Sequence, residues 1–438
     1  MKLIIHRGTH EIGGSCVELC SDSGRTRIVV DVGMPLVTPD RMPFEWRQYK
    51  NLSQEQLIEQ RVLPAVEGLY NHQKLSISAV ILSHAHQDHY GFFRFVHPDI
   101  PIYMSIGTKC IVEISNLFLD TGVNLDQVRT FTMWLPFRVE EFTITPYLMD
   151  HSAPDAAALL IEADGQRLFY TGDFRGHGRK HVLLERLIKN PIYNVDCLVM
   201  EGSMIGREEG QFPDENAVEQ AIFEIIANQS SYAFVFCSSQ NLDRLVSIYR
   251  AVKRARKVLV IDLYTAFVLD KLSAISRSIP QFDWEEVRVL YAYSHAKKLV
   301  EYDRKLLYKY KKAKIGWDEI LTNPHDMVVL SKDNFYFRKV VLRKLDTTSG
   351  SEAIYSMWHG YIEQTDLPKV LKSHNIELVE IHTSGHAYVK DLKKLALAIN
   401  PGCLVPIHTF YPEEFNRISP NVICLNDGEQ LVLANSTK

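Results

Sequence analysis

The feature that most constrains this 438-residue chain is a dense His/Asp cluster at the end of a short apolar run. Residues 77–82 are rich in aliphatic and β-branched side chains, which predicts a buried strand. His84, His86, Asp88 and His89 follow that run within six positions. A strand that ends in a short loop lets alternate side chains converge, and these residue types bind divalent transition metals. The cluster therefore predicts a metal site at a sheet edge.

Three further residues occupy the same kind of position as the cluster. His151, Asp173 and His408 each come just after an apolar, strand-like run. If those strands share a sheet edge, their ends converge. For any one of the three taken alone, a capped turn or a satisfied core histidine is the simpler interpretation. Taken together they suit a two-metal hydrolase, since a bridging carboxylate can hold two cations about 3.5–4 Å apart.

The texture of the chain predicts an α/β protein with two kinds of sheet. Up to about residue 203, short strands alternate with turns and helices, which suggests stacked sheets with outer helices. Strands then alternate with helices of about 10–15 residues, typical of a parallel sheet, until the first texture returns. We expect a domain in two segments, 1–203 and 376–438, around an insertion at 204–375. The expected strands are 27–32, 77–82, 142–147, 167–171, 233–237, 257–262, 377–382 and 403–408, and the expected helices are 107–119, 215–227, 241–255 and 388–399.

Composition narrows the partner and the compartment. Lys and Arg total 49 and Asp and Glu total 53, a formal net charge of −4, so a nucleic-acid site would have to be a local basic patch. The seven cysteines form no CxxC pair, which favours buried, reduced thiols in a cytosolic protein. No apolar run approaches the roughly 20 residues of a membrane span. The start lacks a signal-peptide pattern, so we expect a cytoplasmic protein with no membrane contact.

The cluster and three later segments resemble the metallo-β-lactamase superfamily, whose signature is HxHxDH. The narrower resemblance is to its β-CASP nuclease branch, which includes ribonuclease J. It depends on Glu201 after an apolar strand, on the segment His382-Thr383-Ser384-Gly385-His386-Ala387, and on Pro406-Ile407-His408. Glu11-Ile12-Gly13-Gly14 is also similar to ribonuclease J, whereas the Gly-Ser-Met after Glu201 replaces the family's common Ser-Thr-Tyr. The resemblance covers essentially the whole chain and implies an αββα sandwich with an inserted parallel α/β domain.

The resemblance implies a role for each residue of the site. One metal would be held by His84, His86 and His151 and the other by Asp88, His89 and His408, with Asp173 bridging them. Asp31, after the run 27–30, would hold the ligand loop in place. His386 would be the general acid that protonates the leaving oxygen, oriented by Glu201. Without the family match, His386 would be interpreted as a turn histidine and Glu201 as a surface carboxylate.

These roles imply a ribonuclease that hydrolyses phosphodiester bonds by attack of a metal-bridging hydroxide. The implied cofactors are two divalent ions, zinc with manganese as the alternative, and the implied partner is single-stranded RNA. A hydrolase of small esters or thioesters and a non-catalytic RNA-binding protein stay open as alternatives, as do endo- or 5′-exonuclease mode and a homo-oligomer. The chain ends at residue 438, soon after His408, so we expect it to lack the C-terminal domain of ribonuclease J.

Small polar loops and basic side chains are the candidates for contacts with RNA. Loops of hydroxyl residues, with glycine or amide neighbours, can turn backbone N–H groups toward a phosphate, although each is equally an ordinary turn. The loops are 238–241, 347–351 and 383–385, represented by Ser239, Ser349 and Ser384. Arg175, with Arg179 and Lys180, follows Asp173 closely and is a candidate for backbone contacts. The Lys- and Tyr-rich run 297–314 could bind a strand, but a solvated amphipathic helix is the simpler interpretation.

Overall fold

The computed structural model describes residues 1–345 and 350–433 and divides the chain into two compact units. Unit 1 comprises Met1–Asn116, Asp120–Glu209 and Gly385–Lys438. Unit 2 comprises Leu117–Leu119 and Gly210–Ser384. Unit 2 is therefore an insertion into unit 1, as the change of texture along the sequence suggested.

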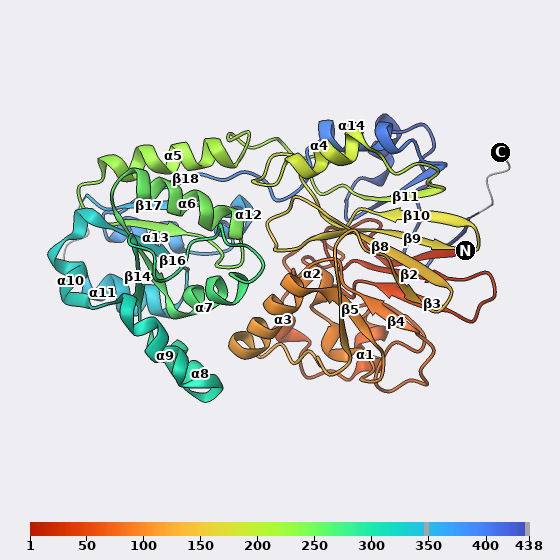
Figure 1. Ribbon diagram of the computed structural model, residues 1–438, viewed down its shortest axis with the longest axis horizontal. Helices are drawn as coiled ribbons and strands as arrows, with labels where there is room; N and C mark the ends of the chain where they lie inside the picture. The colour runs from red at the N-terminus through yellow and green to blue at the C-terminus, as the bar shows by residue number, and fades with distance from the viewer. Residues whose placement is uncertain (346–349, 434–438) are drawn as a thin grey trace. The chain divides into compact units, whose positions relative to one another are not determined.

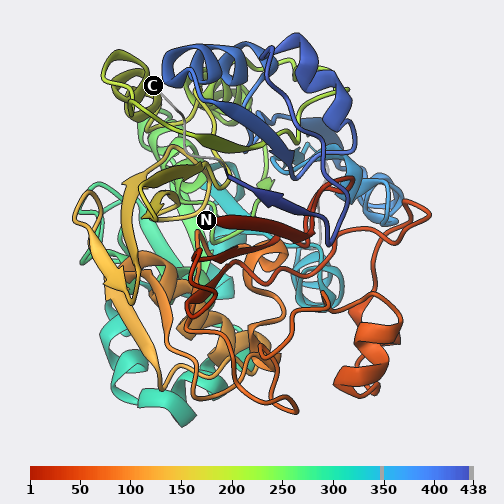
Figure 2. The same ribbon diagram turned by 90° about the vertical axis from the view of Figure 1, so that its right-hand side faces the viewer.

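Two sheets form the centre of unit 1. The first contains β1 (Lys2–Arg7), β2 (Cys16–Cys20), β3 (Arg27–Val30), β4 (Ala79–Ile81), β5 (Ile102–Ser105), β6 (Val128–Phe131) and β20 (Gln430–Val432), in the order β20-β1-β2-β3-β4-β5-β6. The second contains β7 (Phe137–Val139), β8 (Phe142–Leu148), β9 (Ala157–Ala163), β10 (Gln166–Tyr170), β11 (Cys197–Glu201) and β19 (Cys403–Ile407), in the order β19-β11-β10-β9-β8-β7. Figure 2 shows β1, in red, beside β20, in blue, which pair antiparallel.

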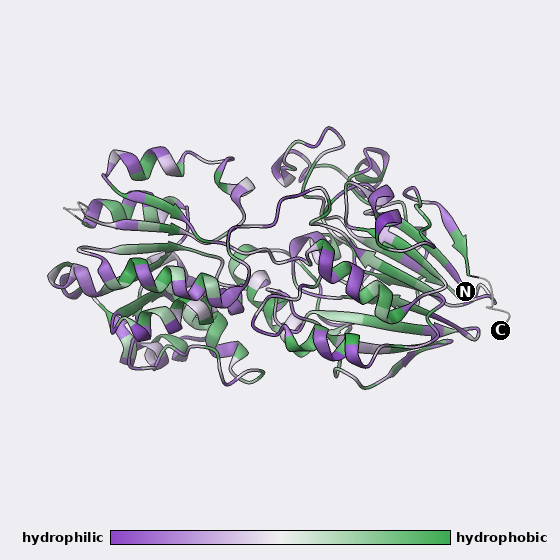
Figure 3. Cartoon of the chain, turned by 90° about the horizontal axis from the view of Figure 1, so that it is seen from above, coloured by the Kyte–Doolittle hydropathy of each residue, from purple (hydrophilic) through white to green (hydrophobic). Residues whose placement is uncertain are grey.

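Apolar side chains fill the space between the two sheets and the space under the outer helices. Ile5 and Val30 of the first sheet and Leu159 and Leu168 of the second are fully buried in one shared core. A second core lies between the other face of the second sheet and the helices α4 (Val182–Lys189) and α14 (Val389–Ile399). Figure 1 shows α4 and α14 side by side over this sheet, and in Figure 3 the strands are mostly green while the outer helices carry purple. The remaining helices of this part are α1 (Gln54–Glu59), α2 (Gln87–Tyr90) and α3 (Ile106–Leu119), which completes the expected αββα sandwich.

Unit 2 is built on a parallel sheet. Its strands are β12 (Ala233–Phe236), β13 (Val258–Asp262), β14 (Val287–Leu290), β15 (Lys314–Ile315), β16 (Met327–Ser331), β17 (Glu352–Tyr355) and β18 (Glu377–Glu380), in the order β15-β14-β13-β16-β12-β17-β18. All neighbouring pairs are parallel. The helices are α5 (Glu215–Asn228), α6 (Leu242–Arg254), α7 (Leu263–Leu272), α8 (Tyr293–Asp303), α9 (Lys305–Tyr310), α10 (Trp317–Thr322), α11 (Leu342–Lys344), α12 (His359–Ile362) and α13 (Leu367–Ser373).

The strand expected at 377–382 lies in unit 2, not in the returning segment of unit 1. It is β18, which pairs with β17 from Glu352↔Glu377 to Tyr355↔Glu380. The expected boundary at 375/376 is therefore wrong, and the chain enters unit 1 after Ser384. The physical reason is that β18 is an edge strand with half-exposed residues, so its mixed pattern looks like the strands of the sandwich. The other expected strands and helices form within two residues of their expected ends.

Two expectations from composition can be compared directly with the structure. Among the described residues, no helix is both long enough and apolar enough to cross a membrane. None of the seven cysteines, all of which are among the described residues, forms a disulfide. Cys16, Cys197 and Cys237 are buried as expected, whereas Cys424 is exposed.

Glu18 of β2 is a buried carboxylate held between two basic side chains. Its oxygens lie 2.6 Å from Arg27 Nε and 2.7 Å from His6 Nε2, and its side chain is 3% exposed. Burial opposes ionisation of Glu18, but the hydrogen bonds from His6 and Arg27 outweigh that effect and lower its pKa to about 2. The contacts of Glu18 with His6 of β1 and Arg27 of β3 link the three strands to one another.

We expect the metal-free protein to lose roughly 2 kcal/mol of unfolding free energy through Glu18 as the pH falls from about 5 to about 2. The pKa of Glu18 in the folded protein lies below the usual glutamate value of 4.5, so this contribution is full above the unfolded pKa and disappears as the pH falls through the folded one. Urea unfolding at stepped pH would measure it against Glu18→Gln, which cannot titrate. A stability difference between the two proteins that stays constant across this range would contradict the assignment.

Candidate metal centre

The ends of five strands in unit 1 supply the site. Asp31 follows β3, the His/Asp cluster follows β4, His151 follows β8, Asp173 follows β10 and His408 follows β19. Asp31 and His408 have positive φ angles of 60° and 55°, so the chain turns sharply where these strands end. Each strand is anchored in the sandwich, which fixes the position of the side chain that comes after it.

Seven side chains gather in two overlapping groups. The first group is His84, His86, His151 and Asp173, and the second is Asp88, His89, Asp173 and His408. Within each group, one nitrogen or oxygen of every residue lies within 4.8 Å of the others. This is the same division into two ligand sets that the family resemblance implies.

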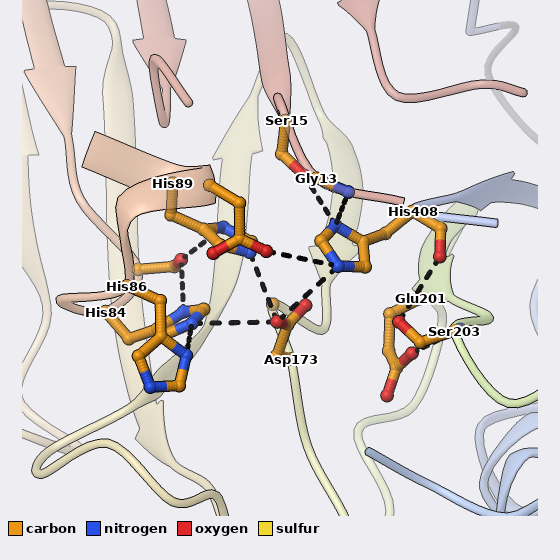
Figure 4. Close-up of polar contacts among 12 residues, drawn as sticks. Gly13, Ser15, His84, His86, His89, Asp173, Glu201, Ser203 and His408 are labelled. Carbon is orange, nitrogen blue, oxygen red and sulfur yellow. Dashed lines mark hydrogen bonds and ion pairs between the residues drawn. The ribbon is translucent and has the colours of Figure 1, made fainter. Parts of the chain in front are cut away.

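Asp173 is the member common to both groups and lies at their centre (Figure 4). Its Oδ2 atom is 3.2 Å from His89 Nε2, 3.6 Å from His84 Nε2 and 3.8 Å from His408 Nε2. Burial opposes ionisation of Asp173, but the neighbouring His408 and His89 hold its pKa well below the usual value. The carboxylate is thus a fixed negative charge between two sets of imidazoles.

The imidazoles of the first group fit the form that binds metals. Burial lowers the pKa of His84 and the pKa of His151 well below the usual histidine value, which keeps both rings neutral. His151 Nδ1 donates to the carbonyl oxygen of Gly385 at 2.7 Å, which leaves the Nε2 lone pair for a cation. His86 Nδ1 lies 3.2 Å from His84 Nε2 and 3.1 Å from His151 Nε2, so three ring nitrogens converge on one point.

Buried polar atoms at the centre also fit a cation. Among the described residues, Asp173 Oδ1 and His408 Nε2 are buried and make no hydrogen bond. Buried polar atoms are normally hydrogen-bonded or coordinate an ion. Imidazoles and carboxylates in two overlapping sets are the donor chemistry of zinc and similar divalent cations, so the residues present fit a pair of such ions.

Asp31 holds the ligand loop through four hydrogen bonds. Its carboxylate accepts from the backbone N–H and the hydroxyl of Ser83, both at 2.8 Å, and from the Tyr170 hydroxyl at 2.9 Å. His89 Nδ1, 2.8 Å from Asp31 Oδ2, donates to the same carboxylate, which turns His89 Nε2 toward Asp173. Asp31 is fully buried, so it acts from behind the ligands.

The Gly13 loop supports His408 from the other side (Figure 4). The Gly13 backbone N–H donates to His408 Nδ1 at 3.3 Å, and Ser15 Oγ lies 3.0 Å from the same nitrogen. Gly13 has φ +90°, and a Cβ there would come 2.7 Å from Leu36 Cγ and 3.1 Å from Asp88 Cβ. Only glycine therefore lets this loop approach the ligands so closely.

Sequence reasoning missed the supporting residues Ser15, Ser83 and Tyr170. Each of them lies within two or three positions of a recognised segment: Ser15 follows Gly13-Gly14, Ser83 opens the His/Asp cluster and Tyr170 ends the strand before Asp173. That nearness was the available signal. Nothing in the sequence separates these hydroxyls from those of ordinary turns.

Glu201 and His386 lie beside the centre. Glu201 is 1% exposed, so the interpretation of Glu201 as a surface carboxylate is wrong. It accepts from the backbone N–H of Ser203 at 2.8 Å and from that of Ala387 at 3.1 Å. His386 Nδ1 is 3.5 Å from Glu201 Oε1 and 3.7 Å from Asp173 Oδ2. Burial lowers the pKa of His386, but the Glu201 and Asp173 charges outweigh it and raise the pKa to about 9.

The residues expected to bind RNA come from both units of the chain. Arg175 is 1% exposed and its Nε lies 3.6 Å from Asp150 Oδ1, so its guanidinium supports the interior and the expected backbone contact is not available. Ser239, in unit 2, is also 1% exposed, and its hydroxyl pairs with Thr265 Oγ1 at 2.6 Å. Ser384 is the last residue of unit 2 and is half-buried. Ser349 lies outside the described residues.

The basic run at 297–314 forms most of α8, all of α9 and a following turn. Leu299 and Tyr310 are fully buried, whereas Tyr302 and Tyr308 are 53% and 61% exposed. The amphipathic helix expected as the simpler interpretation is present.

Comparison with known proteins places this centre in a family context. Residues 54–230 match a family model described as a beta-lactamase superfamily domain. Ribonuclease J of Sinorhizobium meliloti is 25% identical, covering 85% of this chain and 66% of the relative. Ribonuclease J of Helicobacter pylori strain B128 is 23% identical, covering 97% of this chain and 59% of the relative. The chain thus spans about 60–66% of the length of these relatives.

A solved structure shows the same fold. A protein of unknown function from Enterococcus faecalis V583 superposes with a TM-score of 0.78 at 23% sequence identity. The superposition covers 99% of this chain and 99% of that one. The similarity therefore includes both units.

Substitution of the shared carboxylate tests the division into two ligand sets. We expect the zinc-loaded protein to hold about two ions per chain, His151→Ala to lose about one, and Asp173→Ala to lose more than His151→Ala. Elemental analysis by mass spectrometry after gel filtration would measure the ratio. His325→Ala, at a side chain that is 58% exposed in unit 2, is the matched control. Full metal content in Asp173→Ala would show that the sets are wrongly assigned.

Proposed function

We propose that this chain, which has the metallo-β-lactamase fold with a β-CASP-type insertion and is similar to ribonuclease J, is a metal-dependent ribonuclease. The observation that carries the proposal is the placement of His386 between Glu201 and Asp173, the carboxylate common to both ligand groups. A metal centre alone would suit many hydrolases. A protonated imidazole beside it supplies the acid that cleavage of a phosphodiester needs.

Different residues of the chain have different roles in the proposed reaction. Two divalent cations held by the seven ligands would supply an activated water and neutralise charge on the scissile phosphate. His386, with Nδ1 turned toward Glu201 and Asp173, is left with Nε2 to give a proton to the leaving oxygen. In the metal-free protein the Glu201 and Asp173 charges raise the pKa of His386 to about 9, so that the ring carries a proton at neutral pH. Glu201 keeps the imidazolium charged and binds the backbone of Ala387 beside it.

The substrate class follows from the relatives. Both relatives are ribonucleases J, which supports RNA as the substrate of this chain. We further propose single-stranded RNA and zinc, the latter because imidazole and carboxylate ligands in two overlapping sets suit it, with manganese as the alternative. The mode of cleavage, endo or 5′-exo, is the finer question that end-labelled substrates answer.

The principal test uses one RNA labelled at either end, with a 5′-phosphate or a 5′-hydroxyl. We expect cleavage with zinc or manganese, none after chelation, and a loss of about 10²–10⁴-fold in kcat for His386→Ala with metal content unchanged. His325→Ala serves again as the control. Cleavage that survives chelation would overturn the proposal, as would efficient turnover of small esters or thioesters with no action on RNA.

The role of Glu201 as a positioning residue has its own signature. Glu201→Gln removes the charge that raises the pKa of His386. The acid form of His386 is lost as the pH rises, so the falling limb of the kcat profile should move to lower pH in the variant, while KM and metal content change little. Kinetics from pH 6 to about 10 would show the shift. A limb that keeps its position while kcat falls would assign Glu201 a purely structural role.

A further inference from the structure

Unit 2 contains a cavity of about 380 Å³ at the carboxyl ends of its parallel strands. The segments that follow β12, β16 and β17 line it, with residues such as Ser238, Lys332 and Met357. The volume lies within the range of small-molecule sites, which is about 300–1,000 Å³. The cavity is lined entirely by residues of unit 2 and has no part in the metal centre of unit 1.

The topology of the sheet places this cavity where ligands usually bind in α/β folds. From β12 the chain crosses to β13, on the far side of β16. From β16 it crosses in the opposite direction to β17, on the far side of β12. Because such crossovers are right-handed, the two connections leave for opposite faces of the sheet, and a crevice opens between their loops. Ligands of open parallel sheets bind at such switch points.

Aromatic side chains from three elements face this space. Tyr264 of α7, Tyr355 of β17 and Tyr361 of α12 line it, together with apolar residues such as Leu367. Tyr361 is 48% exposed and its ring packs edge-on against Trp358, which is 43% exposed, with ring centroids 5.2 Å apart. Exposed aromatic rings beside a cavity suit a planar ligand that stacks.

The charged groups of the lining are compensated inside unit 2. Lys332 Nζ lies 3.0 Å from Asp262 Oδ2 and 4.5 Å from the centre of the Tyr264 ring. Asp333 forms a charge-paired hydrogen bond with Arg338 Nη2 at 2.8 Å. With both charges balanced, the cavity favours a neutral ring with polar edges over a bare phosphate.

We propose that this cavity binds a nucleobase, either of an RNA strand or of a free nucleotide. Tyr361, whose side chain is 48% exposed, supplies the stacking surface. The Ser238 and Thr365 hydroxyls of the lining hydrogen-bond within unit 2, but each keeps capacity for one more hydrogen bond to a base edge. The polar loop 238–241, expected from sequence to cradle a phosphate, therefore has a different ligand. That the base belongs to an RNA strand rests on the proposed function, whereas the binding of a base by this cavity does not.

The test measures binding to the full chain without turnover, in the presence of EDTA. The probes are adenosine, uridine, a five-nucleotide RNA and the same RNA with one abasic ribose. Binding of each probe is measured by tryptophan fluorescence and by saturation-transfer NMR. We expect Tyr361→Ala to weaken binding of the nucleosides and the RNA by about 5-fold to 100-fold, the effect of losing one base–aromatic stack. Tyr361→Phe should bind normally. Tyr308→Ala, at a 61% exposed tyrosine outside the cavity, is the matched control.

The outcomes distinguish an RNA strand from a free nucleotide as the source of the base. They also distinguish failure of the base-binding proposal from failure of the proposed ribonuclease function. Tighter binding of the RNA than of nucleosides, weakened by the abasic position and by Tyr361→Ala, supports a strand as the source. Binding of nucleosides alone, with the same Tyr361 dependence, supports a free nucleotide. If no nucleoside binds, or if Tyr361→Ala matches Tyr308→Ala, the proposal is overturned. Binding is measured in EDTA, where no cleavage occurs. A failure of the ribonuclease assay would therefore not change the binding result, and successful cleavage would not count as evidence for base binding.

Discussion

The metal centre depends on one buried carboxylate that several strands must present to one another. Asp173 reaches His84, His89 and His408, which come from three separate segments of the chain. None of these contacts is local in sequence, so they exist only once both sheets of the sandwich have packed. A buried negative charge needs positive partners nearby. Because burial keeps the His84 and His151 rings neutral, these histidines do not supply that charge, and bound cations would.

The supporting residues show how the sandwich makes the centre rigid. Asp31 and Ser83 link the ends of two neighbouring strands of the first sheet, and Tyr170 adds a bond from the second sheet to the same carboxylate. His89 is therefore oriented by both sheets at once. Such outer contacts decide which ring nitrogen faces a metal, because the other nitrogen is already committed. The geometry of the ligands is thus a property of the whole sandwich.

Sequence could predict the strands and the residues at their ends, because buried strands have a strong pattern and strands that end at the same edge bring together the residues that follow them. The His/Asp cluster, His151, Asp173 and His408 follow from that rule, and the structure brings them together as expected. The sheet that β18 joins did not follow, since an edge strand of one sheet and a half-exposed strand of another have the same pattern. Burial of Arg175 was also beyond reach, because it depends on the partner Asp150 in a neighbouring loop.

Unit 2 shows a second limit of sequence reasoning. The loop 238–241 was recognised as polar, but its ligand class depends on what surrounds it. Tyr264, Tyr355 and Tyr361 lie far apart along the chain and face the same space only through the order of the parallel strands. A pattern search along the sequence weighs each tyrosine as an ordinary core or surface residue. The topology, not the composition of any one segment, gives the cavity its aromatic character.

The position of unit 2 between the two segments of unit 1 sets an order of assembly during synthesis. Strand β19 pairs with β11, yet all of unit 2 emerges from the ribosome between them. Unit 2 can fold as one nearly continuous stretch while the sandwich still has an open edge along β11. His386 and His408 are made afterwards, so the nascent chain first holds the whole first group and three of the four members of the second, Asp88, His89 and Asp173. The second group of ligands is therefore complete only when the last strand of the second sheet, β19, is in place.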